Sequence, residues 1–505
     1  MPSIFDNGPP PPCPAPFNLA AHVLGRAGSD PDKIALSVLG ADTSCDWTYS
    51  RLEAAVRGTG TGLLRAGLAP GDILLMRLGN TVDFPIAYLG AIAAGMVPVP
   101  TSSQLTEPET ARIIAELSPA AVLRDPAVAC ADHPRQIDLA ALRAMRGNAP
   151  CDWNMGDPNR LAYVVYTSGT SGKARAVAHA HRAIWARQMM VDGWYALTPE
   201  DRLCHAGAFN WTYTLGTGLM DPWTMGATAL IPEPGTVLEA LPGLLRRHRA
   251  SIFAAAPGVY RKFLGDDRHL DLPDLRHGLC AGEKLSPQLR AAWTRATGRA
   301  LYEAYGLSEC STFISSSPGN PARGAALGQP QTGRRVAIVG PQGPVPLGEH
   351  GVIAIHRTDP GLMLGYLNAP QESAAKMQGD WFLTGDLGAM AGDGQITYLG
   401  RNDDMMNAGG FRVSPLEVEA ALAGHPGITQ VGVTDIEVKQ DSRVIVAFYT
   451  GPVPLDETGL ASYVQTKLAR YKQPRAYVHL PALPASANGK LLRRALPAYY
   501  KAQTK

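Results

Sequence analysis

The sequence predicts an α/β protein: a large N-terminal domain built on parallel sheets, followed by a small, mobile α+β domain. Between residues 32 and 301, short apolar segments alternate with Ala-rich segments of helical length, which is typical of βαβ units. After residue 324 the pattern changes to β segments separated by Gly and Pro, which predicts a small β-barrel. A chain of 505 residues also exceeds what one ordinary core supports, so several domains are expected.

Two parallel-sheet α/β subdomains are expected within the N-terminal domain. The first has predicted strands at residues 34–38, 73–76 and 97–99 and predicted helices at residues 52–66 and 84–94. The second has predicted strands at residues 161–166, 228–231, 252–255 and 277–281. Strands at residues 335–339, 351–355 and 395–399 are assigned to the barrel.

A domain boundary is predicted at the charged cluster of residues 401–404. Beyond it, we expect helices at residues 415–423 and 457–468 and strands at residues 428–434 and 443–449. The Pro-rich N-terminus has neither the basic nor the apolar segment of a secretory signal, so an extended arm is predicted there. The expected division is an arm at residues 1–16, an N-terminal domain at 17–402 and a C-terminal lid at 403–505.

Charge and composition favour a small-molecule substrate. The formal net charge is +2, which gives no overall attraction to nucleic acid or to an anionic membrane. No uninterrupted apolar run approaches the roughly 20 residues that a membrane-spanning helix needs. The seven cysteines are scattered without a C-x-x-C pair, which is typical of reduced thiols in the cytoplasm. We therefore expect a cytoplasmic protein, and the sequence leaves a homodimer open.

The segment Tyr166-Thr-Ser-Gly-Thr-Ser-Gly-Lys-Ala-Arg-Ala-Val177 combines hydroxyls, glycines and two cations in one loop. A predicted strand precedes it and a predicted helix begins after it at Ala176, so backbone N–H groups and hydroxyls could surround a phosphate. It is not a Walker loop, because two residues rather than four separate Gly169 from Gly172 and the lysine is followed by alanine. Considered alone, the segment is equally typical of a flexible turn.

Four further segments follow this loop in order: Tyr305-Gly-Leu-Ser-Glu309, Trp381-Phe-Leu-Thr-Gly-Asp386, Gly400-Arg-Asn-Asp-Asp404 and Asn488-Gly-Lys490. Together with the loop they resemble the core motifs of the adenylate-forming superfamily, which includes acyl-CoA synthetases, luciferases and the adenylation domains of nonribosomal peptide synthesis. Each motif alone is weak, but all of them in the expected order make chance an implausible explanation. The resemblance extends from about Phe17 to Leu496.

The resemblance implies that the loop holds the β- and γ-phosphates of ATP. Where the family has Pro-Lys-Gly, this chain has Ala174, Arg175 and Ala176, so the positive charge is retained on a planar guanidinium. We therefore assign Arg175 a catalytic role in binding phosphate oxygens, with altered geometry. The other residues assigned to the phosphates are Thr167, Ser168, Gly169, Thr170, Ser171 and Gly172.

The remaining nucleotide contacts are also assigned by resemblance. Glu309 would bind the Mg²⁺ that bridges the phosphates, since one carboxylate with several waters suits this cation. Asp386 would accept hydrogen bonds from both ribose hydroxyls, with an Asx turn as the alternative, and Arg401 would support the same sugar. The adenine and phosphate would be lined by Tyr305, Gly306 and Ser308 and by Gly282, Glu283 and Lys284, the last two of which could instead form an exposed surface pair.

Several assignments concern the lid. Lys490 resembles the lysine that reaches the α-phosphate and the carboxylate in the transition state, although a lysine in a basic run is usually solvated. Asp403 matches the family's hinge, about which the lid rotates between an adenylation pose and a thioester-forming pose, and an ordinary charged turn is the alternative. Gly409 and Gly410 are assigned to the CoA site, because glycines leave space for a pantetheine thiol. Lys472 or Arg475 would meet the CoA phosphates, and the alternative is that both are surface cations.

The acyl pocket is assigned to Trp211 and Tyr213, with Ala281 beside them. Both aromatics could instead belong to the hydrophobic core. The segment around them resembles medium-chain and aryl acyl-CoA synthetases. Where amino-acid-activating domains place an Asp for the α-amine, the nearest polar residue here is Asn210, so an amino acid substrate is disfavoured.

The resulting hypothesis is an ATP- and Mg²⁺-dependent ligase that converts an aromatic or medium-chain carboxylic acid into an acyl-adenylate and transfers it to CoA. Two alternatives remain open. A stand-alone adenylating enzyme would deliver its acid to a carrier protein. A non-catalytic acyl or nucleotide sensor would account for the altered phosphate loop, but Glu309, Asp386, Arg401 and Lys490 argue against it.

Overall fold

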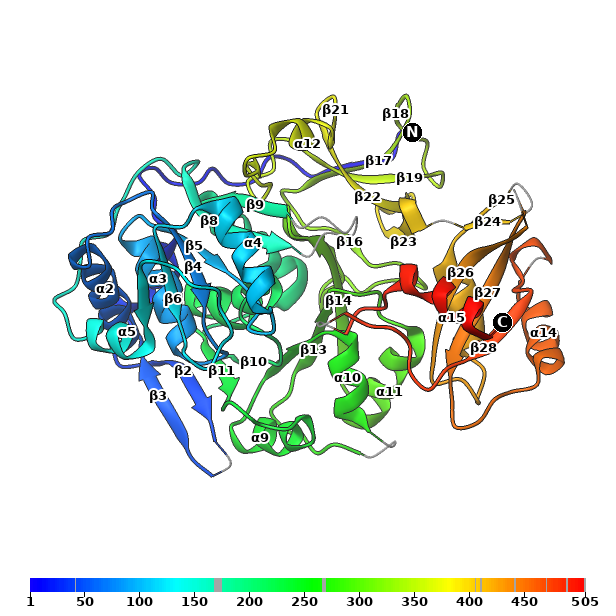
Figure 1. Cartoon of the computed structure of the whole chain (residues 1–505), viewed down its shortest axis with the longest axis horizontal. Coiled ribbons are helices and arrows are strands. Elements are labelled where there is room, and N and C mark those ends of the chain that lie inside the picture. Colours follow the sequence, from blue (N-terminus) through cyan, green and yellow to red (C-terminus); the bar gives the residue numbers. More distant parts are fainter. Residues whose placement is uncertain are drawn as a thin grey trace.

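The computed structural model describes residues 1–505 except 41, 168–174, 266–268, 405, 409–410, 440–441, 469, 487–488 and 504–505. The side chains at 403, 407–408, 411–412, 439, 442, 471 and 503 are also outside the description. Figure 1 shows a large body formed by the N-terminal and central parts of the chain, with a separate lobe formed by the C-terminal part. None of the described helices is long and apolar enough to cross a membrane.

The central sheet is mainly parallel and has the strand order β16-β15-β14-β13-β12-β10-β11-β2-β3. Neighbours from β14 to β2 run parallel, whereas β15, β16 and β3 run antiparallel at the edges. The strands β12 and β13 are buried throughout, as expected where helices cover both faces of a sheet. The bounds are β2 (Ile34–Leu39), β3 (Ser44–Thr48), β10 (Arg202–His205), β11 (Thr228–Pro232), β12 (Ile252–Ala255), β13 (His277–Ala281), β14 (Ala300–Leu307), β15 (Ser311–Ser315) and β16 (Gln329–Pro330).

A second parallel sheet has the order β5-β4-β6-β7, with β4 (Ile73–Arg77), β5 (Val97–Pro100), β6 (Ala121–Arg124) and β7 (Gln136–Asp138). It confirms the predicted parallel α/β class. The predicted separation of the strands into two series along the chain is wrong in one respect, because β2 pairs with β11 and joins the central sheet. Pairing partners so distant in the sequence cannot be read from local pattern.

Polar side chains begin several of the helices that cover these sheets. The Thr48 side chain accepts a hydrogen bond from the backbone N–H of Arg51 at the start of α2, and Ser286 does the same for Leu289 in α11. The bounds are α1 (Leu19–Val23), α2 (Tyr49–Arg65), α3 (Asp83–Ala93), α4 (Glu107–Leu117), α5 (Leu139–Met145), α6 (Arg182–Ala186), α7 (Thr212–Leu215), α8 (Asp221–Met225), α9 (Leu241–Arg247), α10 (Pro257–Leu264), α11 (Pro287–Thr297) and α12 (Pro370–Ala374).

The predicted helix from Ala176 onward is wrong, because this segment forms a strand. The strand β9 (Arg175–Ala180) pairs antiparallel with β8 (Leu161–Thr167) on one side and with β20 (Gly365–Tyr366) on the other. All of β9 after its first residue is buried, so its Ala-rich sequence lacks the alternation that marks a half-exposed strand. Tertiary burial therefore overrides the helix propensity of alanine. The phosphate-loop segment thus connects two antiparallel strands rather than a strand and a helix.

An antiparallel sheet forms the part of the body at the top of Figure 1. Its order is β1-β17-β19-β22-β21, with β18 paired to β17 and β23 paired to β22. The N-terminal arm supplies β1 (Ile4–Asp6), and the indole of Trp185 donates to the carbonyl of Pro11 at 2.9 Å. Closure into a barrel stays a prediction. The other bounds are β17 (Arg335–Gly340), β18 (Gly343–Pro344), β19 (His350–His356), β21 (Met377–Gln378), β22 (Trp381–Met390) and β23 (Ile396–Arg401).

The C-terminal lobe has a hydrophobic core of its own, which includes Val418, Val433, Ile445 and Val464. Its strands pair with one another in the orders β24-β25 and β26-β27-β28. A short 3₁₀ turn at Asn402–Asp404 precedes the lobe. The bounds are β24 (Met406–Ala408), β25 (Phe411–Val413), β26 (Gln430–Lys439), β27 (Ser442–Thr450), β28 (Ala476–His479), α13 (Pro415–Ala423), α14 (Glu457–Gln465) and α15 (Leu496–Gln503).

Candidate active site

The side chain of Asp386 lies at the centre of a small hydrogen-bonded group on β14, β22 and β23. The hydroxyl of Tyr305 donates to Asp386 Oδ2 at 2.6 Å, and Arg401 Nη1 lies 3.2 Å from Oδ1. The register of β22 and β23 creates this pair, because Asp386 and Arg401 are directly opposite each other. Burial and the neighbouring Asp386 carboxylate raise the pKa of Tyr305 well above its usual range, so the phenol remains a donor. This fixed carboxylate suits recognition of vicinal hydroxyls.

Two of the predicted site glycines occupy positions where a side chain would collide with the neighbouring structure. Gly282 follows β13 with φ of +99°, and a Cβ there would lie 2.6 Å from the indole of Trp211. A Cβ at Gly306 would lie 2.0 Å from the carbonyl oxygen of Ser311. Glycine is therefore required at both positions by the close approach of neighbouring protein atoms.

Lys490 of the C-terminal lobe reaches the large body. Its Nζ lies 5.7 Å from the ring centroid of Trp211, and the red segment in Figure 1 extends toward β13 and β14. Burial lowers the pKa of Lys490, while the nearby carboxylates of Glu283 and Asp386 oppose this shift. Burial raises the pKa of Glu283, and Arg261, whose Nη2 lies 3.8 Å from its Oε2, acts in the other direction. The structure therefore places the carboxylates of Glu283 and Asp386 close enough to Lys490 to affect its pKa.

Glu309 is held by a residue from a distant segment. The hydroxyl of Tyr366 donates to Glu309 Oε1 at 2.6 Å, and Tyr366 is placed there by the pairing of β20 with β9. The other carboxylate oxygen, Oε2, has no hydrogen-bond partner among the described residues. A single carboxylate with one oxygen available fits a Mg²⁺ ion that takes its other ligands from phosphates and water.

Arg175 lies at the start of β9 and forms an ion pair with Glu372 of α12. The two side chains are 22% and 36% exposed, so the pair is within reach of solvent. Burial raises the pKa of Tyr366, and the positive charge of Arg175 acts in the opposite direction. The guanidinium therefore lies near Tyr366 and the Glu309 carboxylate that Tyr366 contacts. The structure therefore places Arg175 near Tyr366 and Glu309, together with the acidic partner Glu372, and its phosphate-binding role stays a prediction.

The two predicted acyl-pocket aromatics have different surroundings. Tyr213 is buried, and its hydroxyl donates to the carbonyl of Leu279 at 3.1 Å, so it is anchored in the core of the central sheet. Trp211 is half-buried and lies perpendicular to Tyr213, with ring centroids 5.4 Å apart. Its indole faces Gly282, next to Ala281 at the end of β13. Trp211 is therefore the one of the two that lies against the predicted nucleotide-binding segment at Gly282.

Several other predicted residues take part in local structural contacts. Lys284 Nζ lies 3.5 Å from the buried carboxylate of Glu303 and donates to the carbonyl of Ala325 at 3.1 Å. Lys472 pairs with Glu417 of α13. The carbonyl of Ser308 accepts a hydrogen bond from a ring nitrogen of His179 at 2.7 Å. Nucleotide or CoA roles for these lysines stay predictions.

Part of the predicted site lies outside the described residues. Thr167 ends β8, where its hydroxyl donates to the carbonyl of Arg175 at 3.4 Å. The remaining loop residues, Ser168, Gly169, Thr170, Ser171 and Gly172, are outside the description, as are Gly409, Gly410 and the side chain of Asp403. Their assigned roles stay predictions.

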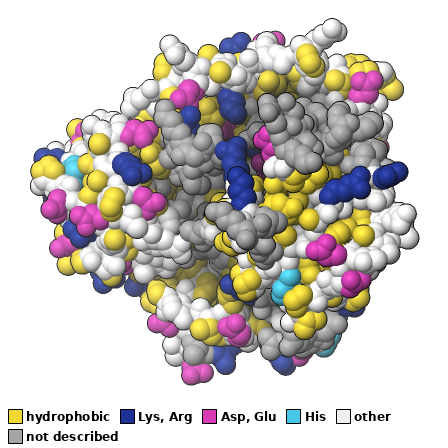
Figure 2. All heavy atoms as spheres, turned by 45° about the vertical axis from the view of Figure 1, so that its right-hand side comes forward, with side chains coloured by type: hydrophobic (Ala, Val, Ile, Leu, Met, Phe, Trp, Pro, Cys, Tyr) yellow, Lys and Arg dark blue, Asp and Glu magenta, His cyan; other side chains and the backbone are white. Residues whose placement is uncertain are grey.

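The structure adds residues that sequence reasoning missed. Tyr366, Glu372 and Arg261 contact predicted site residues directly. Tyr366 lies 57 residues from Glu309 along the chain, so no local spacing connects the two. In the sequence, the feature that marks this position is the pair Gly365-Tyr366 within a segment that has no regular pattern. Figure 2 shows Lys and Arg side chains gathered near the centre of one face, which indicates local positive charge despite a net charge of +2.

Comparison with known proteins identifies the family. Residues 25–367 match the model of the AMP-binding enzyme family, and residues 417–490 match the AMP-binding enzyme C-terminal domain. The mitochondrial acyl-coenzyme A synthetase ACSM5 of Mus musculus is 29% identical, over 96% of this chain and 91% of the relative. The 3-hydroxybenzoate–CoA ligase of Aromatoleum sp. (strain CIB) is 29% identical over 90% and 92%, and the benzoate–CoA ligase of Thauera aromatica is 28% identical over 97% and 98%.

Solved structures show the same fold. A benzoate CoA ligase from Burkholderia xenovorans LB400 is 25% identical, with a TM-score of 0.84 over 95% of this chain and 100% of that one. ATP-bound MatB from Rhodopseudomonas palustris is 23% identical, with a TM-score of 0.88 over 97% and 99%. The chain therefore belongs to the AMP-binding enzyme family and is an enzyme of the class of its relatives, the acyl-CoA synthetases and AMP-forming CoA ligases.

Proposed function

We propose that this enzyme is an ATP- and Mg²⁺-dependent acid–CoA ligase whose substrate is an aromatic or medium-chain carboxylic acid. The observation that carries the proposal is the position of Lys490, which reaches from the C-terminal lobe to the neighbourhood of Asp386 and Glu283. The names of the relatives support the acid class, since they include benzoate, 3-hydroxybenzoate and acyl-CoA ligases.

In the first half-reaction, a carboxylate oxygen attacks the α-phosphorus and the bond to the β-phosphate oxygen breaks, which releases pyrophosphate. Two anions must approach each other, so positioning and positive charge are the enzyme's main tasks. Lys490, in its protonated form, would stabilise the charge that develops on the α-phosphate. Asp386 and Arg401 would hold the ribose, and Tyr305 and Gly282 would border the adenine, while Trp211 would separate the reacting carboxylate from solvent on one side.

The phosphate end of the site would combine the loop with Arg175 and Glu309. The loop residues Thr167 to Gly172 and the Arg175 guanidinium would contact the β- and γ-phosphates. Glu309 would hold Mg²⁺ through the carboxylate that Tyr366 orients, and the bound cation would neutralise phosphate charge. Ser308 would contribute a hydroxyl beside the phosphates, with its backbone held by His179.

In the second half-reaction, the CoA thiol attacks the acyl carbonyl and AMP leaves. We propose that the lid, residues 403–505, rotates about Asp403 relative to residues 17–402 so that Gly409 and Gly410 admit the pantetheine and Lys472 meets CoA phosphates. The separate core of the C-terminal lobe supports a rigid-body rotation, because such a lobe can move without unfolding. A homodimer and a cytoplasmic location are further proposals, which light scattering and cell fractionation would test.

The proposal is tested with a panel of aromatic and medium-chain acids assayed for AMP release with and without CoA. CoA-dependent AMP release together with thioester formation is the expected result. An acyl-adenylate that accumulates and does not react with CoA would instead select a carrier-loading enzyme. Absence of AMP release across the panel would contradict catalysis on these acids and favour a sensor.

A further inference from the structure

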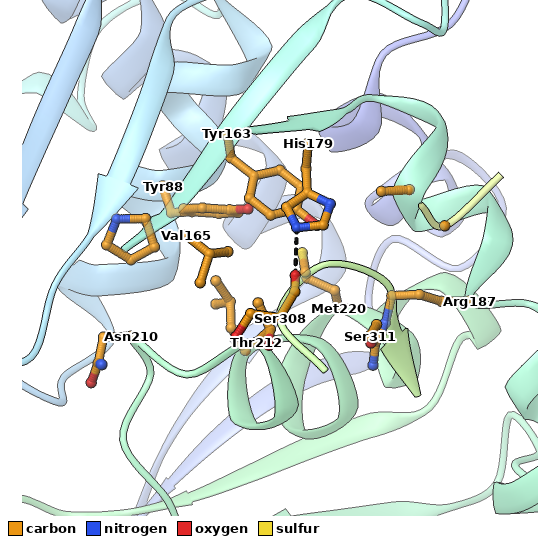
Figure 3. Close-up of a pocket in the computed structure, with 14 residues that line it drawn as sticks. Tyr88, Tyr163, Val165, His179, Arg187, Asn210, Thr212, Met220, Ser308 and Ser311 are labelled. Atoms are coloured by element: carbon orange, nitrogen blue, oxygen red, sulfur yellow. Dashed lines mark hydrogen bonds between the residues drawn. The ribbon is translucent and has the colours of Figure 1, made fainter. Parts of the chain in front are cut away.

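The end of the hairpin between β14 and β15 carries two residues assigned to the phosphate end of the site, Ser308 and Glu309. Neighbouring segments hold it at two backbone positions. His179 Nε2 donates to the carbonyl oxygen of Ser308 at 2.7 Å (Figure 3). The backbone N–H of Met363 donates to the carbonyl oxygen of Glu309 at 2.7 Å. These two contacts fix the first half of the hairpin end.

The second half ends at Ser311, whose backbone conformation is unusual. Its φ is +63°, in the left-handed region that residues with a Cβ rarely adopt. Close to this point, the register of β14 and β15 shifts between Tyr305 and Gly306. Strained backbone conformations persist only where the surrounding structure holds them, and they are frequent at functional sites. Ser311 therefore needs a contact that keeps it in this conformation.

Arg187, at the end of α6, provides that contact from the interior. Its Nη1 donates to the hydroxyl of Ser311 at 2.5 Å, and Figure 3 shows the two side chains next to each other. Its Nε donates to Asp221 Oδ1 at 2.8 Å and its Nη2 to Oδ2 at 2.5 Å, with side-chain exposures of 7% for Arg187 and 4% for Asp221. A buried bidentate pair fixes the plane of the guanidinium, so the direction of Nη1 is fixed as well.

Packing beside the hairpin end is incomplete. A cavity of about 20 Å³, which is room for a single water molecule, is lined in part by Arg187, Ser308 and Ser311. Atoms that face a cavity lack packing contacts on that side. The hydroxyl of Ser311 makes no other hydrogen bond among the described residues. The bond from Arg187 therefore contributes more to the position of Ser311 than it would in a closely packed core.

We propose that Arg187 and Ser311 are positioning residues that direct the carboxylate of Glu309 toward the metal and the phosphates. Arg187 is buried, so it acts through Ser311 and not on the nucleotide itself. Ser311 lies two residues after Glu309, so a change in its backbone conformation alters the direction in which the Glu309 side chain leaves the hairpin. This inference rests on the proposed function, because it takes Glu309 as the ligand of Mg²⁺.

Two substitutions of Ser311 separate positioning from stability. Ser311→Ala and Ser311→Gly both remove the hydroxyl, but only glycine adopts the left-handed conformation without strain. Ser311→Gly should therefore melt about 1–2 °C higher than Ser311→Ala. Both variants should fold, because a water molecule in the cavity can accept the hydrogen bond of Arg187 Nη1. Arg187 is kept, since its removal would leave the carboxylate of Asp221 buried without a cation.

The measurement is the Kd for ATP by isothermal titration calorimetry, in excess Mg²⁺ and in EDTA. The wild type is expected to bind ATP more tightly in Mg²⁺. In both Ser311 variants the Kd in Mg²⁺ should rise about tenfold, the effect of one lost hydrogen bond to a charged group, while the Kd in EDTA should change less than about twofold. The Mg²⁺ concentration that gives half-maximal adenylation at fixed ATP should rise in both variants as well.

Ser118→Gly is the matched control, since Ser118 has a φ of +44° at the end of α4 and belongs to no proposed site. It should melt at a higher temperature than the wild type and keep the wild-type Kd for ATP in both conditions. A Kd in Mg²⁺ that returns to the wild-type value in Ser311→Gly but not in Ser311→Ala would overturn the inference, because binding would then follow stability. Equal losses in Mg²⁺ and in EDTA, or a wild type that Mg²⁺ does not affect, would also overturn it.

The calorimetry separates this inference from the proposed function. If no acid supports AMP release, but both Ser311 variants lose the effect of Mg²⁺ on ATP binding, the ligase proposal fails and the positioning inference stands. If AMP release is CoA-dependent and both Ser311 variants bind ATP as the wild type does, the ligase proposal stands and the positioning inference fails.

Discussion

The ion pair between Arg175 and Glu372 predicts that removal of its acidic member strengthens ATP binding. Arg175 is the cation proposed to meet the β- and γ-phosphates, and Glu372 holds it from α12. A guanidinium that must leave or share a carboxylate in order to reach phosphate oxygens binds them less tightly than one without such a partner. Glu372→Gln keeps the size of the side chain and removes its charge, so the KM for ATP is expected to fall.

The exposure of the pair sets the size of this effect. The side chains of Arg175 and Glu372 are 22% and 36% exposed, and ion pairs of this kind contribute about 0.2–1 kcal/mol. A carboxylate several ångströms from a solvated triphosphate adds a repulsion of at most about 1 kcal/mol. A combined change of about 1 kcal/mol corresponds to a roughly fivefold lower KM for ATP. The free energy of unfolding should change by less than about 1 kcal/mol.

The assay is a steady-state titration of ATP at saturating acid and CoA. Glu53→Gln is the matched control, because Glu53 pairs with Arg57 in α2 at side-chain exposures of 25% and 24% and belongs to no proposed site. Arg175→Ala should raise the KM for ATP several-fold and Arg175→Lys should raise it less. In the Arg175→Ala background, Glu372→Gln should have a smaller effect. An unchanged or higher KM in Glu372→Gln would refute the reasoning, and an unchanged KM in Arg175→Ala would mean that the guanidinium serves only Glu372.

Four other predictions concern the lid and the dependence on pH. Lys490→Ala should slow pyrophosphate exchange about 100- to 1000-fold while thioester formation from supplied acyl-adenylate stays nearly unchanged, and equal losses would contradict the assignment. Because burial lowers the pKa of Lys490, adenylation should decline at a pH below the ordinary lysine value of 10.5, and Lys490→Arg should move that decline to higher pH. Asp403→Pro should preserve one half-reaction and abolish the other, so a full overall rate would place the hinge elsewhere. Finally, the melting temperature should be highest above pH 6.5 and decrease between pH 6.5 and about 3, because the unfolded chain binds protons there that the folded chain does not. Burial lowers the pKa to about 4 for His22, His179 and His277 and to about 3 for His181 and His205, and scanning calorimetry across this range checks the expectation.

Much of the fold could be predicted because local pattern determines strand position. The strands β12 and β13 occupy the expected residues 252–255 and 277–281, since short apolar runs bounded by polar residues have the length of buried strands. The helix α13 likewise spans the expected 415–423, beginning at a Ser-Pro pair that is typical of helix starts. Local pattern failed for β9, where burial of nearly every residue removes the alternation that would distinguish a strand from a helix.

The site was predictable only to the level of its motifs. The glycines at 282 and 306 and the acids at 309 and 386 were assigned by their resemblance to the family's motifs, and their roles stay predictions. Their partners were not predicted, because Tyr366 and Glu372 come from a segment that reaches the site through the pairing of β20 with β9. Such contacts depend on tertiary structure, so the residues that form them show no regular spacing in the sequence. The structure therefore adds the residues that orient the motif side chains.

The charged side chains of the proposed site fall into two groups that differ in net charge. Around the position proposed for the α-phosphate, the described cations are Arg261, Arg401 and Lys490 and the described carboxylates are Glu283 and Asp386, an excess of one positive charge.

At the phosphate end, the described side chains of Glu309 and Glu372 outnumber Arg175, an excess of one negative charge. A triphosphate would be repelled by that end unless further positive charge is present, which is the physical basis for proposing a divalent cation on Glu309. The other end attracts anions, so the acid carboxylate and the α-phosphate would meet where Lys490 supplies the charge that their reaction requires. On this argument Glu372→Gln should also lower the Mg²⁺ concentration needed for half-maximal adenylation at fixed ATP, whereas the Glu53→Gln control should not.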